Sequence, residues 1–273
     1  MKRLSLFLPQ WFAVALSCLF SSTVTAQDDP VARRLEESPR HHEWVEIEAA
    51  EGRKVRCWLV YPEVDKKVPV VVVIHENRGL NDWARSAADQ VAEAGYIAIA
   101  PDLLSGTGPD GSGTEGFADS DAARDGIYKL SPEQVQSDLD AVVKHVRELP
   151  AAEGKVAVGG FCWGGGTTFA YAVHNPDIAA AFVFYGPAPD EDKLKQIQAP
   201  VYGFYGGNDF RITGQVPEVA EQMKSLGKQY DPVTYEGAGH GFMRSGEDPN
   251  GSEADRKSRD EAWKRWREIL GHL

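Results

Sequence analysis

Short apolar runs that alternate with helical patterns constrain the fold of this chain more than any other feature. Residues 68–76 ("VPVVVVIHE") are almost continuously apolar, as in a strand covered on both faces. Further predicted strands lie at 96–102, 155–161, 178–186 and 199–209, and residues 231–242 hold one more strand and a loop. Helical stretches lie at 82–95, 131–149, 216–226 and 253–270, and "GGGTTFAYAVH" (164–174) begins another. This alternation predicts an α/β fold, with a mainly parallel central sheet flanked by helices on both faces.

The first predicted strands differ from the rest. Two alternating runs in "WVEIEAAEGRKVRCWLVYP" flank Glu51-Gly52 and predict an N-terminal antiparallel hairpin. Residues 27–42 are polar, and we expect a flexible segment there. Residues 105–126 are rich in Gly and Asp and are interpreted as one long loop. Since no composition break marks a second unit, we predict a single domain over 43–273.

The first 26 residues have the anatomy of a secretory signal peptide. A cationic start (Lys2, Arg3) precedes an apolar run and a small-residue stop that ends at Ala26. The longest apolar run, 11–20, is too short to span a bilayer comfortably. We therefore predict cleavage after Ala26 and export, to the periplasm or outside the cell. Lipid anchoring at Cys18 is the alternative, although the preceding residues match a lipobox poorly.

Charge and cysteine usage exclude several classes of partner. The net charge is −12, and no basic stripe suits a nucleic acid, so a small-molecule partner is expected. After loss of the signal only Cys57 and Cys162 remain, and Cys57 lies in an apolar strand pattern, as a small buried hydrophobe would. No spacing suits zinc, and the glycines near Cys162 lack the lysine of a phosphate-binding loop. The sequence thus implies neither metal nor organic cofactor.

The segment "GGFCWGGG" (159–166) places Cys162 where a strand ends and a helix begins. Its pattern is G-x-C-x-G, the thiol version of a nucleophile elbow. Such a tight turn strains the nucleophile's backbone and brings neighbouring chains close, so glycine is needed on both flanks. The helix N-terminus favours a thiolate. The plain alternative is a structural glycine-rich turn with a buried cysteine.

Two further residues follow predicted strands in the order that a catalytic triad requires. Asp209 lies after "YGG" and His240 in "EGAGHGF", so the chain order is nucleophile, acid, histidine. Alone, Asp209 would pass for a helix cap and His240 for a surface residue. Together with Cys162 they predict a nucleophile, its base and the group that orients the base.

Glu76 ends the buried strand 68–76, where a carboxylate is costly without a partner or a task. The alternative is an exposed carboxylate at a strand end. The loop that follows is where this kind of fold supplies one oxyanion-hole N–H, and Trp163, next to the nucleophile, is expected to supply the other.

With these motifs the sequence resembles the dienelactone hydrolase (carboxymethylenebutenolidase) family, a cysteine branch of the α/β-hydrolases. The resemblance covers about residues 43–271 and is carried by "HENRGLN", "APDLL", "GGFCWGGG", "YGGND" and "GAGHGFMR". It implies an α/β-hydrolase fold. It also implies roles for individual residues: Cys162 as nucleophile, His240 as general base, Asp209 as its orienting group, Glu76 as an aid to thiolate formation, Asn77 and Trp163 as oxyanion-hole amides, and Arg244 as a contact for the substrate carboxylate.

One departure from the family bears on whether dienelactone is the substrate, and not on ester or lactone hydrolysis in general. Typical members carry a second carboxylate-binding arginine soon after "PDL", and here the matching residue is Gly106. The aromatic residues Phe161, Trp163 and Phe242 suggest a partly apolar pocket. We predict a hydrolase that cleaves ester or lactone bonds through a thioester.

Three alternatives remain beside that prediction. The first is an exported carboxylesterase with no activity on dienelactone. The second is a binding protein on a hydrolase fold, without turnover. The third is a thiol redox role, which would need a resolving cysteine for Cys162.

Overall fold

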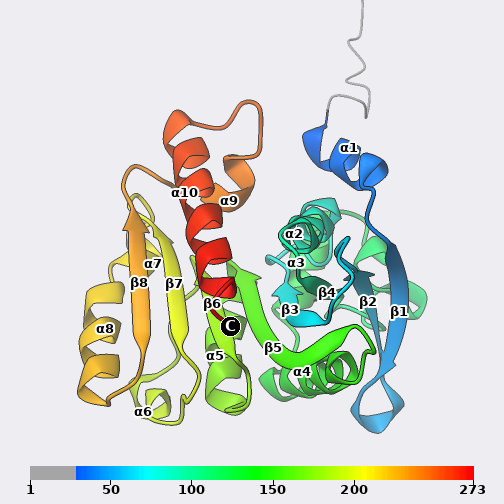
Figure 1. Cartoon of the computed structure of the whole chain (residues 1–273), viewed down its shortest axis with the longest axis horizontal. Helices are drawn as coiled ribbons and strands as arrows, with labels where there is room; N and C mark the ends of the chain where they lie inside the picture. The colour runs from blue at the N-terminus through cyan, green and yellow to red at the C-terminus, as the bar shows by residue number, and fades with distance from the viewer. Residues whose placement is uncertain (1–28) are drawn as a thin grey trace, which may run out of the picture.

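A computed structural model describes residues 29–273, so the predicted signal peptide and Cys18 lie outside the described part. Eight strands form one sheet in the order β1-β2-β4-β3-β5-β6-β7-β8 (Figure 1). The strands are β1 (His42–Glu48), β2 (Lys54–Val60), β3 (Val68–Ile74), β4 (Ile97–Pro101), β5 (Ala152–Phe161), β6 (Ala180–Phe184), β7 (Val201–Gly206) and β8 (Tyr230–Tyr235).

The strand directions follow the predicted pattern. β1 and β2 form an antiparallel hairpin in which Trp44 lies opposite Trp58, and β2 also runs antiparallel to β4. All pairs from β4 to β8 are parallel. The N-terminal hairpin and the mainly parallel sheet are therefore confirmed.

Helices cover both faces of the sheet (Figure 1). The ten helices found within residues 29–273 are α1 (Pro30–Glu37), α2 (Asp82–Glu93), α3 (Ser120–Ile127), α4 (Pro132–Arg147), α5 (Trp163–His174), α6 (Glu191–Leu194), α7 (Phe210–Thr213), α8 (Val216–Ser225), α9 (Phe242–Ser245) and α10 (Glu253–Leu270). None of these helices combines the length and apolar character that crossing a bilayer requires.

Two hydrophobic cores, one on each face, explain the continuous apolar run of β3. Val70, Val72 and Ile74 pack in the core beneath α4, α5 and α8. The alternate residues, Val71 and Val73, pack in the core beneath α2 and α10. Because successive side chains of a strand point to opposite faces, a strand covered on both sides must be apolar throughout.

The segment before β1 differs from the expected flexible segment. Residues 30–37 form helix α1, which packs against α2. Ser38 donates a hydrogen bond to the buried Asp89, and Arg40 forms an ion pair with the same carboxylate at 2.6 Å. The anchoring carboxylate lies about fifty residues further along the chain, so the local composition gives no sign of it.

The region interpreted as a long loop also contains more structure than expected. Residues 105–126 include two 3-10 turns and most of α3. The buried carboxylate of Asp102 accepts hydrogen bonds from the backbone N–H and the hydroxyl of Thr114, both at 2.7 Å. The Thr114 hydroxyl oxygen in turn accepts from the N–H of Leu80, at 2.9 Å. This network joins residues 105–126, called the insertion below, to the loop after β3.

Candidate functional site

The carboxyl ends of β5, β7 and β8 bring Cys162, Asp209 and His240 together. His240 Nε2 lies 3.0 Å from Cys162 Sγ, and His240 Nδ1 lies 2.5 Å from Asp209 Oδ2. Asp209 is 7% exposed, whereas Cys162 is half-buried. The order thiol, imidazole, carboxylate is that of a nucleophile with its base and the group that orients the base.

The backbone at Cys162 is strained, as the elbow motif predicts. Its φ is +56° and ψ is −115°, in a region that residues with a side chain rarely occupy. A Cβ on Gly160 would lie 2.2 Å from the Gly164 carbonyl oxygen, and one on Gly164 would lie 2.3 Å from the His75 carbonyl oxygen. A Cβ on Gly165 would meet the Phe184 carbonyl at 2.4 Å. The glycines are therefore required because the backbones at the ends of β3 and β6 and in the first turn of α5 pass close to this elbow.

Replacing Gly164 with alanine should damage both stability and activity, because rigid backbone atoms cannot move away from the new methyl group. We expect a loss of about 3 kcal/mol or more in the free energy of unfolding. Thermal and denaturant unfolding would measure it. Gly239→Ala is the matched control, since a Cβ there meets only Asp255 Oδ1 at 3.9 Å. Equal stability of the two variants would contradict this account of the elbow.

The loops that carry Asp209 and His240 are tied to each other. The Asn208 backbone N–H donates to the Ala238 carbonyl at 2.9 Å, and its side-chain amide donates to the Gly237 carbonyl at 3.0 Å. Asp255, in the first turn of α10, accepts from the N–H of Gly239 at 2.9 Å. These bonds fix the imidazole relative to the carboxylate.

The charges around His240 favour its protonated form. The hydrogen bond to Cys162 raises the pKa of His240 to about 9, with a further contribution from Asp209, although burial acts in the opposite direction. An imidazolium held beside a thiol favours the thiolate, which is the reactive form of cysteine.

Glu76 lies at the end of β3, buried, and its carboxylate has two partners other than the thiol. Arg244 Nε donates to Oε2 at 2.8 Å, and the Tyr185 hydroxyl donates to Oε1 at 3.2 Å. Burial raises the pKa of Tyr185 well above its usual value, so the phenol stays a donor. Within residues 29–273, the hydrogen-bond partner of Cys162 Sγ is His240 and not Glu76.

Sequence reasoning missed Tyr185. This side chain is fully buried, with ring centroids 5.1 Å apart from His240 in an edge-to-face arrangement. Its φ of +41° is a second strained position beside the site. Tyr185 follows β6 directly, so the rule of inspecting residues at strand ends would have found it.

The backbone amides of Asn77 and Trp163 are available to a ligand. Neither N–H donates a hydrogen bond to another group within residues 29–273. The buried ring of His75 stacks on Trp163 with centroids 5.6 Å apart and bonds the Glu76 carbonyl through Nδ1 at 2.8 Å. Since the Leu103 N–H donates to His75 Nε2, the ring is neutral with its proton on Nδ1, and burial lowers its pKa accordingly.

A cavity of about 710 Å³ opens beside the sulfur, and only one of the three aromatic residues expected at a partly apolar pocket lines it. Trp163 lines this cavity. Phe161 and Phe242 do not, because both are completely buried in the core on the α2 and α10 side. The structure therefore places these two rings under the site, where they support Tyr185 instead of meeting a ligand.

Gly106 occupies the position at which the resemblance would put a second arginine. Its φ is +71°, a conformation that strains any residue with a side chain. Arg53 Nη1 lies 3.6 Å from the place of a Cβ, and this guanidinium is engaged by the buried Asp138 at 3.0 Å. The turn is thus built for glycine, and the neighbouring cation is already paired.

No group of three His, Cys, Asp or Glu side chains in the described range 29–273 is arranged to hold a metal ion.

Comparison with known proteins gives a consistent family. Residues 55–273 match the family model described as "Dienelactone hydrolase family". A relative from Escherichia coli K12, described as "Putative carboxymethylenebutenolidase", is 30% identical over 244 residues and covers 85% of each chain. One from Saccharolobus solfataricus with the same description is 28% identical over 255 residues, covering 81% of this chain and 95% of its own.

A crystal structure described as a "Putative Dienelactone Hydrolase" from Klebsiella pneumoniae has the same architecture. It superposes with a TM-score of 0.75 at 25% identity and covers 86% of this chain and 99% of its own. The α/β-hydrolase fold expected from the sequence is therefore confirmed.

Proposed function

Because this chain belongs to the dienelactone hydrolase family, we propose that it hydrolyses ester or lactone bonds with Cys162 as its nucleophile. The observation that carries the proposal is the unbroken series Cys162–His240–Asp209, with contacts of 3.0 and 2.5 Å, at a strained elbow. The description of both relatives as carboxymethylenebutenolidases supports a lactone or ester as the substrate class.

The first half of the reaction forms a thioester. The Cys162 thiolate attacks the substrate carbonyl carbon, and the electron pair of the C=O bond moves to oxygen. The N–H groups of Asn77 and Trp163, free of protein acceptors within the described chain, would stabilise this oxyanion. As the tetrahedral intermediate collapses, the C–O bond breaks and the His240 imidazolium gives its proton to the leaving oxygen.

The second half releases the acid. Neutral His240 takes a proton from water, and the resulting hydroxide attacks the thioester carbonyl. When the C–S bond breaks, the electron pair returns to sulfur, and the thiolate beside the imidazolium is restored. Asp209 keeps Nδ1 of the ring protonated throughout, so that Nε2 always faces the sulfur.

Arg244 and Glu76 would link substrate charge to this chemistry. A carboxylate on the substrate would compete with Glu76 for the Arg244 guanidinium, which is half exposed and now pairs with Glu76 at 2.8 Å. Glu76 released in this way would be a second proton acceptor near the thiol. With Gly106 in place of the second arginine, Arg244 alone would hold such a carboxylate, so neutral esters belong among the first substrates to test.

Trapping of the acyl-enzyme tests the proposed function directly. Mature protein (27–273) is mixed with a p-nitrophenyl ester or with cis-dienelactone, quenched in acid and weighed by mass spectrometry. We expect one acyl group on Cys162, and none on the Cys162→Ala variant. Cys57, buried in β2, is the internal control. Ligand binding without adduct or turnover would instead favour a binding protein.

Expression of the full-length chain, residues 1–273, tests the predicted export. We propose that residues 1–26 direct secretion and are removed, and N-terminal sequencing of material from the periplasm or culture medium would check it. A mature chain that begins at Gln27 is the expected result.

A further inference from the structure

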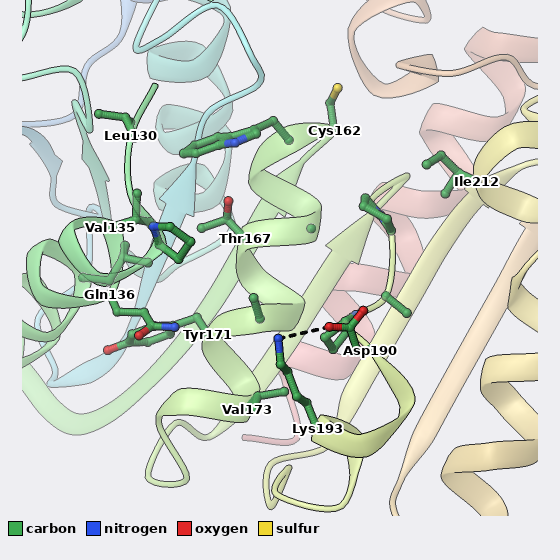
Figure 2. A pocket seen from close by; sticks show the side chains of 18 of the residues that line it. Leu130, Val135, Gln136, Cys162, Thr167, Tyr171, Val173, Asp190, Lys193 and Ile212 are labelled. Carbon is green, nitrogen blue, oxygen red and sulfur yellow. Dashed lines mark ion pairs between the residues drawn. The ribbon is translucent and has the colours of Figure 1, made fainter. Parts of the chain in front are cut away.

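A groove runs from Cys162 along the outer face of α5, away from the residues that the reaction requires. Figure 2 shows Cys162 at one end and Val173, Asp190 and Lys193 at the other. α5 forms its floor, the start of α4 one wall, and residues 187–190 with Ile212 the other. From Trp163 to Val173 the floor extends about 15 Å at 1.5 Å per helical residue.

The floor of this α5 groove is made of small and apolar side chains. Gly166, Thr167, Ala170 and Val173 recur at the spacing of one helix face, and each is partly exposed. An exposed helix face normally carries charged or long polar side chains. α5 has no charged residue before His174, so its outer face has the composition of a surface that is covered by a ligand.

The walls are apolar as well. Val135, Leu139 and Ile212 are buried, and they line the groove together with Leu130 and Ala188. Apart from the pair Cys162 and His240 at one end, four charged side chains line the groove, two of each sign and all exposed: Glu133, Asp190, Lys193 and Arg211. Asp190 and Lys193 pair with each other at 3.1 Å (Figure 2). The groove therefore has no net charge to attract an anion or a cation.

Beyond β6 the chain forms a helix, α6, of only four residues. Residues 187–190 approach α5 closely, and a Cβ on Gly166 would lie 2.9 Å from Pro187. The uncovered floor continues without interruption to Cys162 and His240, which line the same cavity.

We propose that the α5 groove binds an extended, uncharged apolar substituent of the substrate's reacting carbonyl. This inference rests on the proposed function and narrows its substrate class to esters or lactones with a long alkyl or aryl group. A cavity of 710 Å³ is of the size that holds a drug-sized ligand, and a small lactone would leave most of it empty. Arg244 and Glu76 do not line it, so a substrate carboxylate has no partner there.

Chain-length preference tests the proposal on both sides of the scissile bond. One series compares p-nitrophenyl acetate with p-nitrophenyl octanoate, and the other compares methyl acetate with octyl acetate. In at least one series we expect kcat/KM to rise roughly tenfold or more with the longer chain. Ala170→Trp, which fills the groove, should abolish that rise and leave the short acetates within about twofold. Ala170→Ser, which leaves the groove open, is the matched control.

Three outcomes would overturn the proposal. One is a kcat/KM that does not change with chain length in either series. Another is a chain-length ratio that Ala170→Trp leaves unchanged, with Thr167→Leu as the second filling variant if the first unfolds on heating. The third is a change of oligomeric state in Ala170→Trp with unchanged preference, which would make the groove an interface between copies. If wild-type protein hydrolysed p-nitrophenyl acetate no faster than the Cys162→Ala variant, the proposed function itself would be refuted.

Discussion

Replacing Cys162 with alanine is expected to lower kcat for p-nitrophenyl acetate by about 10⁴-fold or more, the scale seen when a covalent nucleophile is removed. The thioester cannot form without the sulfur, and Glu76 is engaged by Arg244 and Tyr185. The variant keeps the Cβ, so the backbone strain at φ +56° and the packing of the glycines stay as they are. It should lose only the stability that the hydrogen bond with Cys162 gives to protonated His240.

Cys57→Ala provides the matched control for that loss. Cys57 is completely buried in β2, and its sulfur lies near the Val55 carbonyl, away from the site. Its variant should lose some stability from the cavity and keep kcat. Burst kinetics and steady-state rates on both variants, with unfolding curves alongside, would separate the two effects. A Cys162→Ala enzyme within about tenfold of wild type would mean that another group attacks the carbonyl.

The strand-end residues were predictable from sequence because each is defined by its neighbours along the chain. Cys162, Asp209 and Glu76 follow short apolar runs, and His240 follows the strand predicted within 231–242. Parallel strands bring their carboxyl ends to one edge of the sheet. The start of a helix is likewise determined by neighbouring residues. The helical stretch predicted at 131–149 begins at Ser131, whose hydroxyl accepts a hydrogen bond from the Gln134 N–H at 3.1 Å.

Other features depend on partners far away in the sequence. Phe161 and Phe242 flank catalytic motifs, yet both pack into the core, because which face a side chain takes is decided by the helices that cover it. α1 is held by Asp89, and the insertion by Asp102 through Thr114. Local composition predicts loops for such segments. The carboxylates that hold them through ion pairs and buried hydrogen bonds lie elsewhere in the sequence.

The groove is a case of the same kind. The sequence "GGGTTFAYAVH" does not indicate which face of α5 is exposed, because its apolar residues are spread almost evenly around the helix axis. The open face is defined by segments distant in the sequence, because the start of α4 and residues 187–190 form the walls on either side of α5. If the α5 groove binds substrate as proposed, segments outside the series Cys162–His240–Asp209 would set the substrate range.

His240 should control the reactivity of Cys162 in a way that depends on pH. The hydrogen bond to Cys162 raises the pKa of His240 to about 9, so in the folded protein the ring keeps its proton below that pH. A group with a raised pKa in the folded state stabilises the fold fully below its unfolded value, about 6.5. This stabilisation is lost as the pH rises through about 9. The positive charge beside the sulfur is lost over the same range.

His240→Gln should therefore slow alkylation of Cys162 by iodoacetamide roughly tenfold or more at pH 7, since an opposite charge at 3.0 Å favours the thiolate. The ratio of wild-type to variant rate should fall as the pH rises and approach one above about pH 9, where the wild-type ring has lost its proton. His174→Gln is the control, because His174 lies at the end of α5 that is far from Cys162 and pairs with Asp140 of α4, so this variant should leave the rate unchanged. If the ratio of wild-type to variant rate instead grew between pH 7 and 10, an imidazolium beside the thiolate would be contradicted. His240 would then act only as a neutral base.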